Sequence, residues 1–407
     1  MRSAYSKSIA GVFGLMAADA ALAQPSTLAD AVSQPIRVER PEPVSTVPLT
    51  LKYGKLQVDA KLSETAGRFV FDTGSPTILT RDYADRIGVR YIGRNTGRDS
   101  NGTEVVMDIA IADSIDMGGT VFRDVPVMVS AFENSPMARC VLHDGVIGSE
   151  ILEGSAWKID LEAELMTIGP DAKSVGTARR ARTAPLHSKA YPHMPIVDYT
   201  IGDIQDRALF DTGNSAVLAL YSRVLASDSV DGSIEEDSVQ RGRGSEGVSA
   251  GGLGKETDLA RFDVDKMRIG ENTMRGLPAI SRANPPSLIG AGFLSDFIVT
   301  LDYVADQFRF EERTQSGSRP DRPDFALSVV DGQAVVSQLF QRTRAAKAGL
   351  RIGDVVTSVN GKSVKQEPQA GDCSLLDWIL TDFDANSTRT LVVVRQGERI
   401  ALELFPK

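Results

Sequence analysis

The chain has few thiols and few imidazoles, with only two cysteines and three histidines in 407 residues. Cys140 and Cys373 fall in different predicted domains, so a disulfide between them would require those domains to dock, and we expect two buried free thiols instead. A metal site needs several clustered ligands, whereas the ligand-like spacing of Cys140 and His143 has no second pair nearby. The sequence therefore predicts no metal and no cofactor.

Positive charge and long apolar runs are also scarce. There are 45 Lys and Arg against 54 Asp and Glu, and the formal net charge of −9 argues against nucleic acid or an anionic membrane as a partner, because both favour clustered basic residues. Residues 9–18 are apolar but too short to cross a bilayer, and Asp19 follows them, so we expect no stable membrane span. With 42% apolar residues and 36 glycines, the chain has the composition of a folded, turn-rich protein of more than one domain.

The N-terminus has the three-part pattern of a secretory signal peptide. Two basic residues precede the apolar run, and Ala21-Leu22-Ala23 forms a small-residue cleavage site that would remove residues 1–23. The alanine-rich leader is of bacterial type, so we expect a periplasmic or secreted protein. Residues 24–45 are rich in proline and polar residues, and we expect them to be disordered after export.

Two landmarks occur twice in the same order. Residues 68–75 read RFVFDTGS and residues 207–214 read RALFDTGN, with the aspartates 139 residues apart (211 − 72). Downstream, an apolar-apolar-glycine triplet occurs at residues 146–148 and again at residues 288–290, 142 residues apart (290 − 148). Two landmarks at almost the same spacing indicate two copies of one unit, because a chance pair of Asp-Thr-Gly triplets would not carry the second landmark with it.

Each copy is predicted to be all-β with little helix. An apolar strand ends at each aspartate, and a short helix follows over residues 81–87 in the first copy and 221–226 in the second. A hairpin then turns at Asn101-Gly102 in the first copy, while the equivalent part of the second copy, residues 242–254, is rich in glycine.

The predicted fold class is mainly β, with two homologous lobes facing one cleft and a smaller α+β domain at the C-terminus. We place lobe 1 at residues 46–170 and lobe 2 at residues 192–312. Residues 171–191 show no periodicity and contain a basic cluster, which predicts a solvated linker. The C-terminal domain is expected over residues 324–407.

The doubled Asp-Thr-Gly triplets point to paired-carboxyl chemistry. Hydrolysis of a peptide bond without a metal or a nucleophile requires one group that takes a proton from water and another that gives a proton to the carbonyl oxygen. Two carboxyl groups held close together cannot both ionise easily, so they share one proton and can divide those two roles. We predict that Asp72 and Asp211 form this catalytic pair.

The residues after each aspartate are suited to holding it. Threonine hydroxyls can anchor the two loops by hydrogen bonds, and glycine lets the backbone approach a carboxylate closely. The predicted supporting residues of the active-site loops are Thr73, Gly74, Ser75, Thr212, Gly213 and Asn214.

This pattern resembles the aspartic peptidases, and more particularly the retropepsin-like members of the pepsin/retropepsin superfamily. The resemblance covers both copies, from residue 46 to residue 312, and implies that two lobes close hairpin flaps over an extended polypeptide substrate. Asn214 departs from the usual small residue, so a hydrogen bond to the Asp211 carboxylate would have to come from the Asn214 amide or from Ser215. The first predicted flap, at residues 99–104, lacks the tyrosine of pepsin-type flaps.

The C-terminal region resembles a PDZ domain of the bacterial protease-associated kind. The resemblance rests on a short helix ending at Gly349, a turn at Gly353-Asp354 and a tight turn at Asn360-Gly361. Such domains bind an extended peptide ligand as an added strand in a groove between one of their strands and a helix. The predicted groove residues are Phe325, Ala326 and Leu327.

Several readings stay open from the sequence. The leading one is an aspartic endopeptidase whose two carboxyls meet within one chain. A variant of it pairs each repeat with its twin in a second chain. An alternative from another class is a catalytically inactive scaffold that acts by binding peptides through the PDZ-like domain, although the presence of both triplets weighs against it. The PDZ-like domain could also serve as a structural cap on lobe 2.

Overall fold

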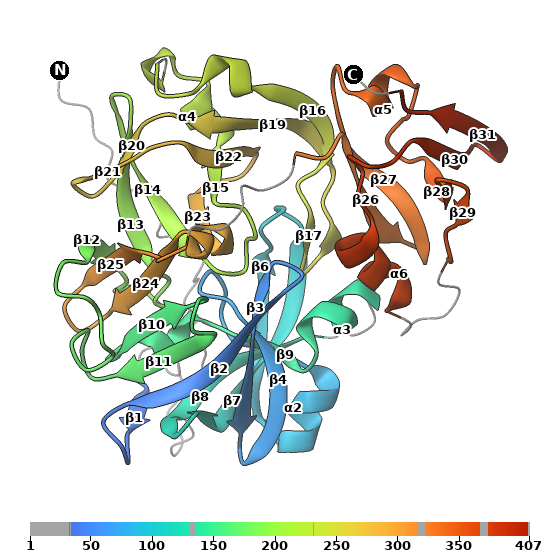
Figure 1. Ribbon diagram of the computed structural model, residues 1–407. Helices are drawn as coiled ribbons and strands as arrows, with labels where there is room; N and C mark the ends of the chain where they lie inside the picture. Colours follow the sequence, from blue (N-terminus) through green and yellow to red (C-terminus); the bar gives the residue numbers. More distant parts are fainter. Residues whose placement is uncertain are drawn as a thin grey trace, which may run out of the picture.

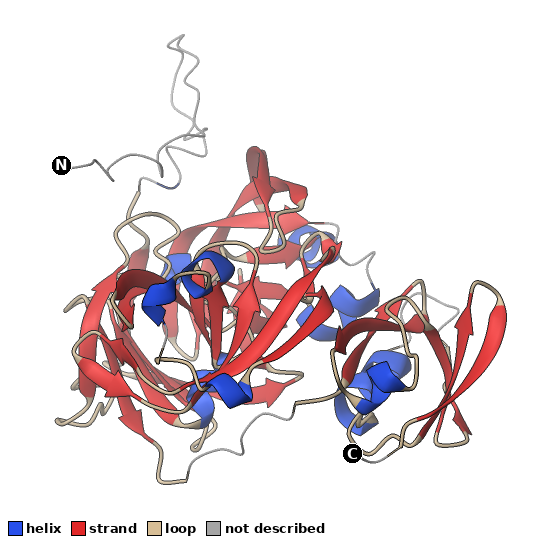
Figure 2. Cartoon of the chain, turned by 90° about the horizontal axis from the view of Figure 1, so that it is seen from above, coloured by secondary structure: helices blue, strands red, loops and turns tan. Residues whose placement is uncertain are grey.

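The computed structural model describes residues 32, 34–130, 136–230, 232–315, 322–366 and 373–405. Strands dominate two lobes and a smaller C-terminal domain, which lies to one side of them in both views (Figures 1 and 2). The predicted fold class is thereby confirmed. No helix in the described part of the chain is long and apolar enough to cross a membrane. The predicted signal peptide lies outside the described residues.

Lobe 1 is organised around the strand that leads to Asp72. This strand, β4, pairs antiparallel with β3 and parallel with β9, and its Phe69 and Phe71 are fully buried. The Thr80 hydroxyl caps the following helix and Gly88, at φ 67°, ends it, so the predicted helix forms at its expected place. The elements of lobe 1 are β1 (Arg37–Glu39), β2 (Ser45–Lys52), β3 (Lys55–Leu62), β4 (Thr65–Phe71), β5 (Ile78–Thr80), α2 (Arg81–Ile87), β6 (Arg90–Arg98), β7 (Glu104–Met117), β8 (Thr120–Ser130), α3 (Pro136–Leu142), β9 (Gly145–Ile147), η2 (Ser149–Leu152), β10 (Ala156–Asp160) and β11 (Leu165–Gly169).

Lobe 2 repeats this arrangement around the strand that ends at Asp211. Here β14 pairs antiparallel with β13 and parallel with β23, which matches the β4 pairings in lobe 1. The elements of lobe 2 are β12 (Arg182–His187), β13 (Ile196–Ile201), β14 (Ile204–Asp211), β15 (Leu218–Tyr221), α4 (Ser222–Leu225), η3 (Asp228–Val230), η4 (Glu236–Ser238), β16 (Gln240–Ser245), β17 (Val248–Ser249), β18 (Gly252–Leu253), β19 (Glu256–Val264), β20 (Met267–Ile269), β21 (Asn272–Met274), β22 (Leu277–Arg282), β23 (Ser287–Gly290), η5 (Ala291–Ser295), β24 (Phe297–Asp302) and β25 (Gln307–Glu312).

One sheet joins the two lobes beneath these strands. Strand β10 of lobe 1 pairs with β24 of lobe 2, and the sheet continues through β11 to β2 on one side and through β25 to β12 on the other (Figure 1). Its core includes Trp157, which stacks on Phe71 with ring centroids 5.8 Å apart, and Phe308, which packs against Phe210 at 5.2 Å. The rings that precede the two aspartates are therefore anchored in one shared hydrophobic core.

Two predictions about irregular segments were wrong. Within the stretch 24–45, expected to be disordered, residues 37–39 form β1 and pair with β8. Within the expected linker 171–191, residues 182–187 form β12, which pairs with β25 and β13. Both strands are short and lack periodicity of their own, so their pairing with an existing sheet, and not local propensity, makes them ordered.

The C-terminal domain continues the sheet of lobe 2. Its strand β27 pairs with β26 and, near its end, also with β16 of lobe 2 through Arg243 and Leu339. The Arg261 guanidinium lies 3.8 Å from the centre of the Phe340 ring and adds to this contact. The elements of this domain are β26 (Phe325–Val330), β27 (Gln333–Phe340), α5 (Arg344–Lys347), β28 (Val355–Val359), β29 (Lys362–Ser363), α6 (Ser374–Asp377), η6 (Trp378–Asp382), β30 (Thr390–Arg395) and β31 (Glu398–Glu403).

A disulfide also ties this domain to lobe 1, which corrects the prediction of two free thiols. Cys140 in α3 and Cys373 just before α6 are bonded, with Cα atoms 5.7 Å apart, although the two residues are 233 positions apart in the sequence. The two helices lie side by side in Figure 1. Because the C-terminal domain docks on the lobes through β16, its second helical segment comes within bonding reach of lobe 1, and no local sequence pattern reports such docking.

The two lobes also meet through their hairpins. Flap 1 is the β6–β7 hairpin with its tip at residues 99–103, and flap 2 is the segment between β16 and β19, residues 246–255. The Asp99 carboxylate accepts a hydrogen bond from the Gly251 amide at 2.8 Å, and the Ser100 hydroxyl donates to that of Ser249 at 2.9 Å. Strand β17 of flap 2 lies beside β6 in Figure 1. The two flap tips are therefore closed against each other.

Candidate active site

Each aspartate stands at the end of a strand that the fold fixes in the same way. The Asp72 amide donates to the Ile147 carbonyl at 3.0 Å, which extends the parallel pairing of β4 with β9. In lobe 2 the same parallel register places Asp211 opposite Gly290. The repeated apolar-apolar-glycine triplets thus form the strands that support the two aspartate loops.

The two loops hold each other through their threonines. The Thr73 hydroxyl donates to the Phe210 carbonyl at 2.5 Å and accepts from the Thr212 amide at 3.1 Å. Reciprocally, the Thr212 hydroxyl donates to the Phe71 carbonyl at 2.7 Å and accepts from the Thr73 amide at 3.0 Å. Both threonines are completely buried. This network of four hydrogen bonds fixes one loop relative to the other across the lobe boundary.

The glycines of the triplets bring the carboxyl groups close together. The amides of Gly74 and Gly213 each donate at 2.9 Å to the carboxylate two residues before them. A Cβ atom added at Gly74 would lie 2.5 Å from the Asp211 carboxyl carbon, and one at Gly213 would lie still closer to the Asp72 carboxylate. Only glycine fits at either position, because each loop passes directly against the carboxylate of the other lobe.

Burial and proximity change the acidity of the pair. Burial and the neighbouring Asp211 carboxyl raise the pKa of Asp72 to about 8, while the positive charge of Lys55 and the Gly74 amide act in the opposite direction. Both aspartates nevertheless keep some solvent exposure. The arrangement can therefore hold one proton between two carboxyls and still present them to a reacting water molecule.

Apolar residues flank the two aspartate strands. On the lobe 1 side, Val70 packs in a small cluster with Ile78, Met107 and Val146. On the lobe 2 side, the corresponding residues are Leu209, Ala219 and Leu288, with Met194 and Ile196 packed against them. Val70 and Leu209 each lie two residues before an aspartate. These clusters give the site low-dielectric walls, which accounts for the cost of ionising both carboxyls.

The side chains of Ser75 and Asn214 make hydrogen bonds within their own turns. The Ser75 hydroxyl donates to the Pro76 carbonyl at 2.7 Å, and the Asn214 side-chain oxygen accepts from the Ala216 amide at 2.9 Å. Ser215 is exposed. Asn214 therefore shapes its own turn, and Gly213 provides the amide that contacts the Asp211 carboxylate.

Three charged residues near the aspartate loops were not singled out by the sequence. Lys55 donates to the Gly213 carbonyl, and Arg282, only 8% exposed, interacts electrostatically with Asp211. Glu150, 1% exposed, lies beneath the Asp72 loop and accepts from the Thr77 amide at 2.7 Å. For Lys55 the internal repeat could have given a signal. The 139-residue offset aligns this charged residue with an apolar residue of the second copy, Met194.

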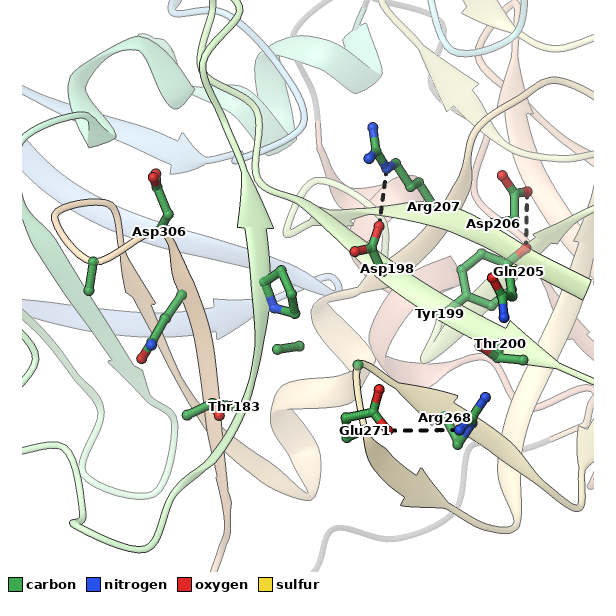
Figure 3. A pocket seen from close by; sticks show the side chains of 15 residues that line it. Thr183, Asp198, Tyr199, Thr200, Gln205, Asp206, Arg207, Arg268, Glu271 and Asp306 are labelled. Atoms are coloured by element: carbon green, nitrogen blue, oxygen red, sulfur yellow. Dashed lines mark hydrogen bonds and ion pairs between the residues drawn. The ribbon is translucent and has the colours of Figure 1, made fainter. Parts of the chain in front are cut away.

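A cavity of about 710 Å³ lies on lobe 2 but includes neither aspartate of the pair (Figure 3). Four of its six charged lining residues form two ion pairs, Arg207 with Asp198 at 3.1 Å and Arg268 with Glu271 at 3.9 Å, and the other two are Asp206 and Asp306. Within the described residues, no group of three His, Cys, Asp or Glu is arranged to hold a metal ion.

The predicted PDZ groove residues all lie on β26. Phe325 and Leu327 are buried in the core of the domain with Leu375 and Ile379, so only their backbone could meet a peptide, while Ala326 is partly exposed. Among the described strands, β26 pairs with β27 alone. Its second edge therefore carries no strand and faces the helical segment of α6 and η6.

Comparison with protein families agrees with this architecture. Residues 58–151 match the family described as Aspartyl protease, and residues 335–373 match the family described as PDZ domain. No curated protein matches the chain. The first match contains Asp72 and the supporting triplet at residues 146–148. The chain thus carries an aspartyl protease domain of the type suggested by its repeated triplets, and a PDZ domain at its C-terminal end.

Proposed function

We propose that the protein is an exported aspartic endopeptidase that hydrolyses peptide bonds in polypeptides with the Asp72–Asp211 pair. The observation that carries this proposal is the reciprocal threonine and glycine arrangement, which brings one carboxyl from each lobe together. A scaffold without catalysis would have no need for two close carboxyls, since their proximity and burial make ionisation costly.

The pair acts on water in the proposed reaction. With one shared proton, the ionised carboxylate takes a proton from a water molecule as its oxygen attacks the peptide carbonyl carbon. The protonated carboxyl gives its proton to the carbonyl oxygen, which yields a tetrahedral diol. A proton then passes to the amide nitrogen, the C–N bond breaks, and a carboxylic acid and an amine are released. The two roles belong to the pair as a unit, because its protons titrate together.

The flaps and the C-terminal domain would handle the substrate. The closed tips of flap 1 and flap 2 would separate to admit an extended chain and then exclude water around the scissile bond. The free edge of β26 would receive a peptide ligand as an added strand. Because β27 pairs with β16, which leads directly into flap 2, this peptide site is joined to the flap by one continuous sheet.

The disulfide supports export to an oxidising compartment. Disulfides persist in the bacterial periplasm and outside the cell but are rare in the cytosol. The bond between Cys140 and Cys373 is consistent with the predicted secretory leader, and we propose the periplasm or the external medium as the working location.

The proposal is tested by hydrolysis of a mixed peptide library by the chain from residue 24 onward, at about pH 3 to 8, the range in which a carboxyl pair titrates. We expect cleavage by the wild type and loss of cleavage in Asp72→Asn and Asp211→Asn. Asp206→Asn is a matched control, because this lobe 2 aspartate contacts Tyr199 and lies outside the pair.

If the wild type cleaves no peptide at any pH from about 3 to 8, the proposal is contradicted. If the same protein still bound peptides in a titration calorimeter, and substitution in β26 removed that binding, the inactive scaffold would replace the peptidase as the function.

A further inference from the structure

Lys55, in lobe 1, places a cationic side chain against the Asp211 loop of lobe 2, beside the aspartate pair. Its ammonium group donates a hydrogen bond to the main-chain oxygen of Gly213. The amide of the same glycine donates to the Asp211 carboxylate at 2.9 Å, and its Cα hydrogen faces the Asp72 carboxylate so closely that no side chain would fit there. Lys55 therefore binds a residue that contacts both carboxyl groups, and the matching glycine of lobe 1, Gly74, makes the same two contacts from the other side.

The hairpin that carries Lys55 is fixed against the second aspartate loop. The β2–β3 turn passes through Gly54 at φ 70°, and a Cβ atom there would lie 2.7 Å from that of Ser215. Lys55 then opens β3, with Lys52 as its partner on β2. Its side chain is only partly exposed, so its charge is screened less than that of a surface lysine.

The charge breaks the symmetry of the two lobes. The pairing of Gln57 with Val70 in lobe 1 corresponds to that of Ile196 with Leu209 in lobe 2, so the counterpart of Lys55 is Met194. Met194 packs against the apolar cluster of lobe 2. A cation therefore lies at this position on one side only, although the aspartates and their loops are repeated.

The other charged groups facing the site do not reproduce this contact. Arg282, at the end of β22, interacts with Asp211 and with Glu246 at the base of flap 2, and the Glu246 carboxylate accepts a hydrogen bond from the Ala283 amide. The Arg282 guanidinium donates to the Asn284 carbonyl. Lys55 is the group whose positive charge acts on Asp72.

We propose that Lys55 is a positioning residue of the carboxyl pair, holding the loop after Asp211 and placing one positive charge beside the two carboxyl groups. The inference rests on the proposed peptidase function, because it assigns Lys55 to that reaction. Its charge opposes the effects of burial and of Asp211, which raise the pKa of Asp72. Without this cation, Asp72 would hold its proton to higher pH.

Three substitutions separate charge from hydrogen bonding. Lys55→Arg keeps both, Lys55→Gln keeps a donor for the Gly213 carbonyl without the charge, and Lys55→Met removes both. We expect the pH profile of kcat/KM to move upward by about one unit in Lys55→Gln and Lys55→Met, the usual minimum effect of one nearby opposite charge, and to stay in place in Lys55→Arg. Lys52→Met on the same hairpin is the matched control and should leave the profile unchanged.

A second measurement does not depend on catalysis. The ¹³C signals of the aspartate carboxyl carbons, assigned with Asp72→Asn and Asp211→Asn, should titrate at higher pH in Lys55→Gln than in the wild type. Identical titrations in these two proteins would overturn the role of Lys55 even if peptides are cleaved. A clear shift without any cleavage would retain the role of Lys55 and remove the peptidase proposal. A profile in Lys55→Arg that moves as far as that of Lys55→Gln would also contradict the charge argument.

Discussion

Glu150 is expected to make the protein less stable as the pH rises from about 4.5 to about 7. One of its carboxylate oxygens accepts from the Thr77 amide at 2.7 Å, while the other is buried with no hydrogen-bond partner among the described residues. Burial raises the pKa of Glu150 from 4.5 to about 7, against the hydrogen bonds to Thr77 that favour the ionised form. The folded protein therefore keeps this proton where the unfolded chain has already released it.

The sign and size of the effect follow from proton linkage. Between the two pKa values the unfolded chain binds fewer protons than the folded protein, so stability is complete below the unfolded value and falls as pH rises toward about 7. A difference of this size corresponds to on the order of 3 kcal/mol above pH 7. Glu150→Gln keeps the acceptor for Thr77 and resembles the protonated acid, so it should avoid this loss.

Thermal unfolding midpoints of the wild type and Glu150→Gln at pH 5, 6, 7 and 8 measure the prediction. We expect the smallest difference at pH 5, and an advantage of the variant that grows up to about pH 7 and then levels off. Glu164→Gln, at an exposed turn, is the control and should follow the wild type. The reasoning would be refuted by a difference between Glu150→Gln and wild type that does not change with pH.

Three further outcomes follow from the same structure. Thr212→Val removes both cross-lobe hydrogen bonds of that hydroxyl and leaves buried partners unpaired, so unfolding in denaturant should show a loss of roughly 2–4 kcal/mol, whereas Thr212→Ser should lose little. The double variant Cys140→Ser with Cys373→Ser should lower the unfolding midpoint of the C-terminal domain in scanning calorimetry, by a stability loss of roughly 2–5 kcal/mol, and reductant should do the same to the wild type. Peptide hydrolysis should decline as pH rises through about 8, where Asp72 gives up the shared proton, and a rate that keeps rising past that pH would exclude this pair as the acid.

The aspartate loops could be predicted from the sequence because each part of the motif is a short stretch of sequence and the whole motif occurs twice. A hydrophobic strand, Asp-Thr-Gly and a later apolar-apolar-glycine triplet specify one loop and the strand beneath it, and the second copy supplies the partner. The helix at residues 81–87 could also be predicted from the sequence, because Thr80 and Gly88 are strong capping residues.

Features that depend on the docking of distant elements could not be predicted from the sequence. The disulfide needs the C-terminal domain to be seated on β16, and β12 needs the interlobe sheet as a template. Lys55 and Glu150 carry no local signal, because a lysine after a turn and a glutamate after a serine are ordinary surface residues. Their placement beside the aspartate loops follows from strand register and packing, which one sequence does not display.

The most direct test of the account mixes two inactive proteins. Asp72→Ala and Asp211→Ala are purified separately, each is assayed for peptide hydrolysis beside the wild type, and the two are then combined in equal amounts and assayed again. The account predicts that the wild type alone is active, because both aspartates of one site lie in one chain, held together by the threonine network between its lobes. Activity in the mixture, or in either single variant, would contradict it.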